Sequence, residues 1–152
     1  MTYAKESFHV TGLSIRTSND PGKAERDIPA LWARFLSSAA ATDIPGITGS
    51  DIYCVYTAYE DDHTKPYTVV LGYRTDAPEA IPAPYRSITV PGGAYRKVSV
   101  AGRLADGIVV EAWMQIWQSG WDRAYTADYE VYGAAAQDQE AAEVDIFIAV
   151  KD

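Results

Sequence analysis

The spacing of hydrophobic and polar residues along the first half of the chain predicts its elements. Residues 8–17, 51–60 and 66–75 are rich in β-branched and aromatic residues at alternating or continuous positions, which predicts three strands. Apolar residues in 27–38 (DIPALWARFLSS) recur at intervals of three and four, which predicts a helix. Both faces of 51–60 are largely apolar, so we expect that strand to be covered on both sides. The stretch 39–50 indicates a loop.

The second half of the chain repeats this pattern. Residues 85–90 and 94–102 predict two strands joined by a glycine turn. Residues 105–120 (ADGIVVEAWMQIWQSG) predict a helix with a narrow polar stripe. Residues 125–133 and 142–150 predict two more strands. The order strand–helix–strand–strand therefore occurs twice.

A duplicated pattern of this kind defines the expected fold. With 152 residues the chain suits one domain with a sizeable core, which we assign to residues 1–152. We expect an α+β fold in which two βαββ repeats, about 7–76 and 85–150, are joined by a connector at about 77–84. An antiparallel sheet with two helices would leave a pseudo-twofold cleft between the halves, where ligands bind.

Charge narrows the range of partners. The chain has 13 Lys and Arg against 21 Asp and Glu, which gives a net charge of −8. Direct nucleic-acid binding needs a basic face, so we expect none, while cationic ligands are mildly favoured.

Other features bear on location and cofactors. Cys54 is the single cysteine, so no disulfide can form within the chain. No residues cluster at metal-ligand spacing, and we expect neither a metal nor a cofactor. The N-terminal sequence lacks the apolar region of a signal peptide, and no apolar run is long enough to span a membrane. A cytoplasmic protein without membrane contact is the expectation.

The stretch TADYEVYG (126–133) carries the chemistry that stands out most. Asp128, Glu130 and Tyr132 share one face of the predicted strand, so a carboxylate lies beside aromatic rings. Glu130 either faces water or lies in an apolar pocket where it attracts a positive charge. We expect Asp128 to lie nearer the strand end, in water.

Several motifs in one order give the chain a family resemblance. They are VTGLSIRTSN, IPALWARF, IYCVYTAYEDD, VVLGYRT, VPGGAYRKV, AWMQIW, RAYTADYEVYG and VDIFIAV, which together run from about Phe8 to Val150. This sequence resembles the GyrI-like effector-binding family, which also occurs as the ligand domain of AraC- and MerR-type multidrug regulators. The resemblance implies a duplicated βαββ fold with a hydrophobic cleft and a buried glutamate that attracts lipophilic cations. Glu130 matches that glutamate.

The resemblance also implies a mode of action. Family members of this length often stand alone, and nothing in this chain indicates a helix-turn-helix. We therefore expect a stand-alone small-molecule binding protein without catalytic residues. Unpaired edge strands can pair with a second copy of the chain, so the sequence is compatible with both a monomer and a homodimer.

The ligand-binding candidates are Glu130 and the aromatic residues that strand parity and helical spacing place near it. Rings around a carboxylate add cation–π attraction to a bound cation, about 0.5 to 2 kcal/mol each. The hairpin face that meets the cleft is undecided, so both Tyr56 and Tyr59 are included; the helical aromatics could equally be core. The full set is Glu130, Tyr132, Trp113, Trp117, Trp32, Phe35, Tyr56, Tyr59 and Tyr73.

Two alternatives to a binding module remain. Some relatives of the same fold resemble hydrolases, in which case Glu130 would be a general base and Tyr132 or Tyr59 would polarise the electrophile. Two convergent acids in the cleft would support that interpretation. The third possibility is an inhibitor-type protein-interaction module that uses an acidic surface.

Overall fold

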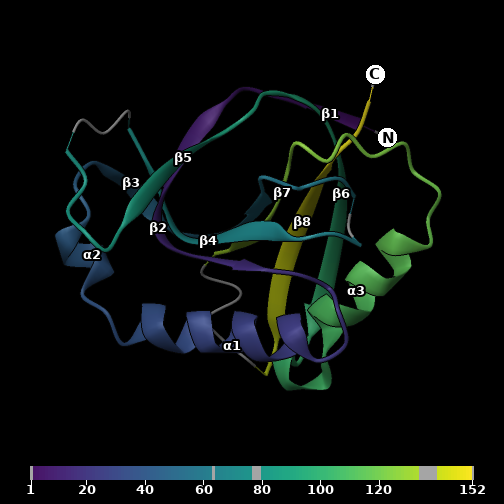
Figure 1. Cartoon of the computed structure of the whole chain (residues 1–152), viewed down its shortest axis with the longest axis horizontal. Coiled ribbons are helices and arrows are strands. Elements are labelled where there is room, and N and C mark those ends of the chain that lie inside the picture. The colour runs from purple at the N-terminus through teal and green to yellow at the C-terminus, as the bar shows by residue number, and fades with distance from the viewer. Residues whose placement is uncertain (1, 63, 77–79, 134–139, 152) are drawn as a thin grey trace.

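The fold is an eight-stranded antiparallel sheet with helices on one face, seen in a computed structural model that describes residues 2–62, 64–76, 80–133 and 140–151 (Figure 1). The predicted α+β class is confirmed. In chain order the elements are β1 (Thr2–Lys5), β2 (Phe8–Thr17), α1 (Lys23–Leu36), α2 (Ala40–Asp43), β3 (Ile47–Thr57), β4 (Tyr67–Thr75), β5 (Arg86–Val90), β6 (Gly93–Gly102), the short 3-10 helix η1 (Leu104–Asp106), α3 (Ile108–Trp117), β7 (Ala127–Tyr132) and β8 (Ala142–Ala149).

The strand order β1-β6-β8-β7-β3-β4-β2-β5 consists of two matching halves. Strands β2, β4 and β3 form one half and β6, β8 and β7 the other, and they meet where β3 pairs with β7. Each half is preceded in the chain by one more strand that pairs with the other half: β1, which precedes β2, pairs with β6, and β5, which precedes β6, pairs with β2. This order supports the predicted repeats, whose bounds stay a prediction.

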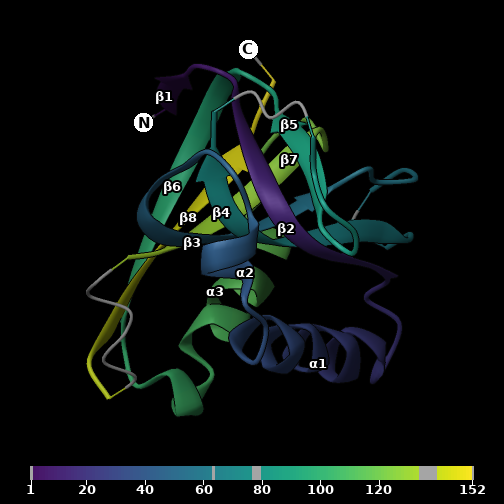
Figure 2. The same cartoon turned by 90° about the vertical axis from the view of Figure 1, so that its left-hand side faces the viewer.

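The sheet is strongly curled, so its two ends come near each other (Figures 1 and 2). Only residues 6 and 7 separate β1 from β2, although β1 is the first strand of the sheet order and β2 the seventh. The curl requires a close approach of β2 and β4, where Gly12 lies opposite Gly72. A Cβ on Gly72 would lie 2.0 Å from the carbonyl oxygen of Thr11, so no side chain fits there.

Both faces of the sheet are buried, as the apolar strand 51–60 predicted. Helices α1 and α3 lie on the same face (Figure 2), and their residues Phe35 and Trp113 join the larger core cluster with Tyr56 of β3. On the other face, Phe8 and Tyr129 belong to a second cluster of aromatic and branched residues. Strand β7, at the centre of the sheet, therefore has a core on each side.

The predicted helix boundaries need correction. Helix α1 begins at Lys23, four residues before its predicted start, because Gly22 adopts a left-handed conformation (φ 81°) that ends the preceding turn. Helix α3 is shorter than the predicted 105–120, since η1 and Gly107 precede it. Strand β1 and helix α2 were not predicted; each has only four residues, too few to show a period.

We expect Gly72→Ala to lower the free energy of unfolding by about 3 kcal/mol, because the new methyl group would force β2 and β4 apart. Gly22→Ala is the matched control: no atom lies within 4 Å of its added Cβ, so only the left-handed backbone is strained, by about 1 to 2 kcal/mol. Urea unfolding of both variants checks this. Equal losses would mean that the sheet accommodates the methyl group.

Candidate functional site

Two carboxylates of the central strand β7 are buried on the helix-facing side of the sheet. Glu130 is 1% exposed and Asp128 is 0% exposed. Strand alternation places both on one face, as predicted. The expectation that Asp128 lies in water is wrong. The chain before β7 runs back beside the end of β8, where Arg123 bridges to Val150, and so covers the end of the strand.

Glu130 accepts hydrogen bonds from three neutral donors. The hydroxyl of Tyr56 and the indole N–H of Trp113 donate to Oε2 at 2.7 and 2.6 Å. The hydroxyl of Tyr132 donates to Oε1 at 2.6 Å. Strand β3, helix α3 and β7 itself thus each supply one donor to the same carboxylate.

Burial raises the pKa of Glu130 above its ordinary value of 4.5. The hydrogen bonds from Tyr132, Tyr56 and Trp113 oppose this, because they stabilise the ionised form, but desolvation is the larger effect. Among the described residues no lysine, arginine or histidine forms a salt bridge with Glu130. The acid therefore lacks the positive charge that would make ionisation favourable in an apolar site.

Asp128 differs from Glu130 in having an internal cation, although burial raises the pKa of Asp128 as well. Arg123 Nη2 donates to Oδ2 at 2.8 Å, and both side chains are almost fully buried. The hydroxyl of Tyr59 also donates to Oδ2, at 2.5 Å, and the backbone N–H of Ala149 donates to Oδ1 at 2.8 Å. Two neighbouring acids on one strand thus differ in kind: one is neutralised by an internal cation and the other is not.

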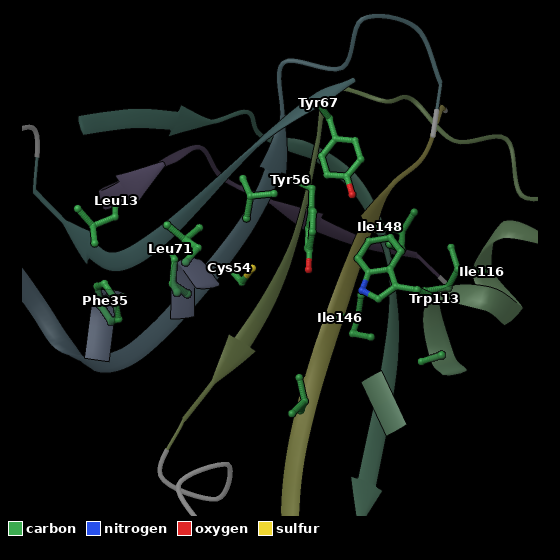
Figure 3. Close-up of a cluster of buried hydrophobic side chains, with 14 of the residues drawn as sticks. Leu13, Phe35, Cys54, Tyr56, Tyr67, Leu71, Trp113, Ile116, Ile146 and Ile148 are labelled. Atoms are coloured by element: carbon green, nitrogen blue, oxygen red, sulfur yellow. The ribbon is translucent and has the colours of Figure 1, made fainter. Parts of the chain in front are cut away.

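Aromatic rings surround the carboxylate of Glu130. The ring of Tyr56 lies 5.0 Å from that of Trp113, and Figure 3 shows the two side chains pointing toward each other. Trp32 of α1 packs edge-on against Tyr132 at 4.8 Å. Each of the two long helices therefore contributes one tryptophan. Trp113 of α3 contacts Glu130 directly, and Trp32 of α1 contacts Tyr132, which in turn bonds to Glu130.

The undecided hairpin face is resolved by the backbone. Tyr56 and Tyr59 have opposite parity, yet their hydroxyls reach Glu130 and Asp128 on the same side of the sheet. Ala58 between them has a positive φ of 50°, which interrupts the strand alternation. Tyr67 packs between them, with ring centroids 6.0 and 5.8 Å away.

Three of the predicted binding residues lie away from the carboxylate. Phe35 and Tyr73 pack on each other at 5.4 Å, and Figure 3 shows Phe35 beside Leu13 and Leu71 rather than beside Trp113. Trp117 is 37% exposed at the end of α3. Helical spacing predicted that Phe35 shares a stripe with Trp32, and Trp117 with Trp113. It did not predict that, of these four residues, only Trp32 and Trp113 lie near Glu130.

The sequence analysis missed Arg123, Tyr67 and Cys54 as neighbours of the two acids. Cys54 lies directly across from Glu130 in the β3–β7 pair, and burial raises the pKa of its thiol well above the ordinary value. Arg123 lies in an irregular segment before β7, where no periodicity indicates a direction. The only indication in the sequence is that Arg123 lies five positions before Asp128, close enough along the chain to form an ion pair with it.

The site is closed in this structure. A hollow of about 390 Å³ lies on the opposite face of the sheet, lined among others by Phe8, Tyr53 and Tyr129, and Glu130 does not border it. Within the described ranges no group of three or more His, Cys, Asp or Glu could hold a metal ion. No helix in the same ranges has the length and hydropathy to cross a membrane.

The fold and the family comparison together place the chain in the GyrI-like class of effector-binding proteins. The family described as Cass2, integron-associated effector binding protein, matches residues 3–150. The chain belongs to this family, which confirms the resemblance found in the sequence.

Individual relatives agree with this assignment. The chain is 34% identical, over 92% of its length and 90% of the relative's, to the "Putative transcriptional regulator protein YobU" of Bacillus subtilis (strain 168). The integron cassette protein VCH_CASS2 from the mobile metagenome of Vibrio cholerae has a similar structure, with a TM-score of 0.77 and 28% identity over 99% of this chain and 95% of that one. SAV2435, solved bound to tetraphenylphosphonium, shares the fold with a TM-score of 0.73 and 18% identity over 99% and 93%.

The raised pKa of Glu130 predicts a pH dependence of stability. An acid whose pKa is higher in the folded state stabilises the fold fully below its unfolded pKa, about 4.5, and this contribution is lost as the pH rises through the folded value. Glu130→Gln removes the contribution, while its amide oxygen can accept from Tyr56 and Trp113 and its NH₂ group can donate to the hydroxyl of Tyr132. We expect the variant to gain stability relative to the wild type between pH 5 and pH 8 in urea unfolding. Parallel pH profiles would contradict the assignment.

Asp128→Asn should lower the free energy of unfolding by about 3 to 5 kcal/mol, because it leaves the charge of Arg123 buried without a partner. Asp145→Asn is the control: its pair with Lys97 spans 3.7 Å at the surface and contributes at most about 1 kcal/mol. Thermal or urea unfolding compares the two. Similar small losses would show that the buried pair is not needed for the fold.

Proposed function

We propose that this protein captures lipophilic cations and that Glu130 is their counter-charge. The observation that carries the proposal is a fully buried carboxylate that receives three neutral hydrogen bonds and pairs with no cation among the described residues. A bound cation supplies the missing charge, which lets the carboxylate ionise without leaving the apolar site.

The surrounding rings suit the same kind of ligand. Tyr56, Tyr132 and Trp113 contact the carboxylate, and Trp32 packs behind Tyr132. Their faces attract a desolvated cation, and flat walls tolerate many ligand shapes. Tyr59 belongs to the same side through Asp128. We place Phe35, Tyr73 and Trp117 at the margin of the pocket.

Binding requires the site to open, and Trp113 is the side chain best able to move. Tyr56 and Tyr132 are held by central strands, whereas Trp113 is on α3, which also carries the exposed residues Val110 and Met114. Displacement of the indole removes one of the three donors from Glu130 and uncovers the carboxylate. The positive charge of the bound cation then stabilises the ionised carboxylate in place of the lost hydrogen bond from Trp113.

Similarity to known proteins supports the class of ligand. The chain belongs to an effector-binding family, and SAV2435, which shares the fold, has been solved with the lipophilic cation tetraphenylphosphonium. The relative YobU supports a role in reporting the ligand to transcription. The corresponding form is a cytoplasmic protein that is monomeric or homodimeric.

The geometry favours binding over hydrolysis. Two buried acids do share one face, which would support the hydrolase alternative, but the oxygens of Asp128 are occupied by Arg123, Tyr59 and Ala149. Both oxygens of Glu130 likewise accept hydrogen bonds, and its side chain is almost completely buried from solvent. Neither acid is placed as a general base.

Glu130→Gln should weaken tetraphenylphosphonium binding at least tenfold, because the bound cation loses its counter-charge. Neutral triphenylphosphine should bind wild type and variant with affinities within about twofold. Tryptophan fluorescence titration measures both, since Trp113 lies in the site. Equal losses for both compounds would assign the effect to a damaged pocket and contradict the proposal.

A further inference from the structure

Arg123 has two hydrogen-bond donors without a partner. Its side chain is 4% exposed, and only Nη2 bonds to Asp128. The Nε and Nη1 atoms are buried and have no hydrogen-bond partner among the residues that the structure describes. Buried N–H groups are nearly always satisfied in folded proteins, so an unsatisfied guanidinium calls for an acceptor that the described part of the chain does not supply.

The Trp113 side chain connects this guanidinium to the proposed pocket. The indole N–H donates to Glu130 at 2.6 Å, while the centre of the Arg123 guanidinium lies 5.9 Å from the indole ring. One side chain therefore occupies a space that is bordered by the carboxylate and by the guanidinium. A ligand that displaces the indole meets both groups.

Arg123 is held in place from several directions. Its backbone pairs with Val150 at the end of β8, and its guanidinium stacks on the ring of Tyr125 at 4.4 Å. Tyr125 adopts a positive φ of 54°, which is strained for a residue with a side chain and occurs most often at functional sites. The donors of Arg123 are thus fixed in direction before any ligand arrives.

The charge balance decides which acceptor fits. Asp128 already neutralises Arg123, so a second anion would add an uncompensated buried charge. A neutral carbonyl oxygen accepts from the free N–H groups without adding one. Asp128 and Glu130 are two residues apart on β7, about 6.6 Å along the strand, so the carbonyl must lie within a few bonds of the cationic centre.

We propose that Arg123 is a second ligand-binding residue, which donates to a neutral carbonyl oxygen of the same cation whose charge faces Glu130. This inference rests on the proposed function and adds a specificity to it: the preferred ligands are lipophilic cations with a nearby ketone, ester or amide. The indole of Trp113 occupies this position in the closed site, with its N–H toward Glu130 and its ring toward Arg123.

Two quaternary ammonium ions test this preference. Benzyldimethylphenacylammonium and benzyldimethylphenethylammonium carry the same permanent charge and have similar size, and they differ in whether a carbonyl or a methylene group lies beside the CH₂ on nitrogen. Isothermal titration calorimetry of the wild type should show about tenfold tighter binding of the phenacyl compound. Equal affinities would overturn the inference while leaving the proposed function standing. Absence of binding by both compounds would overturn both.

Variants identify the residue responsible. Arg123→Lys keeps a positive charge for Asp128 but removes the planar fork of donors, so the preference should fall to twofold or less. Glu130→Gln should weaken both compounds and leave their ratio near tenfold. If the lysine variant does not fold, the double variant Arg123→Met with Asp128→Asn removes both charges together and should also lose the preference. A ratio that stays tenfold without Arg123 would contradict its role.

Discussion

The rest of the site depends on one constraint: the carboxylate of Glu130 is buried in the middle of a sheet, and no described residue gives it a positive partner. Three neutral donors hold it in place, and desolvation raises its pKa. Two residues away, Asp128 shows the other solution, an internal ion pair with Arg123. The chain can thus bury an acid with its own cation and does not do so at Glu130, which is why we assign the missing charge to a ligand.

The fold accounts for how Glu130, in the proposed function, can be buried and yet be reached by a ligand. The curled sheet fixes β3 and β7 side by side, so Tyr56 and Tyr132 cannot leave the carboxylate without disrupting the core. Trp113 comes instead from α3, part of whose surface is exposed. In the proposed site, strand β7 holds the carboxylate in a fixed position, which provides preorganisation. Helix α3 covers the carboxylate and can move, which provides access.

Sequence patterns predicted the fold more completely than the site. Period-two and period-3.6 spacing located the longer strands and both long helices, and parity on β7 placed Glu130 beside Tyr132. Parity failed after Ala58, whose positive φ brings Tyr59 to the same side as Tyr56, since no local pattern encodes that turn. Asp128 was misplaced because its burial depends on Arg123, a tertiary contact from an irregular segment.

The most direct test is the pKa of Glu130 itself, measured from the side-chain carboxyl ¹³C shift of glutamate-labelled protein over a pH titration. The signal is assigned by comparison with Glu130→Gln. The account predicts a pKa above 4.5 in the free protein and a lower value once tetraphenylphosphonium is bound, because the cation stabilises the ionised form. A free-protein pKa at or below 4.5, or one that the bound cation leaves unchanged, would contradict it.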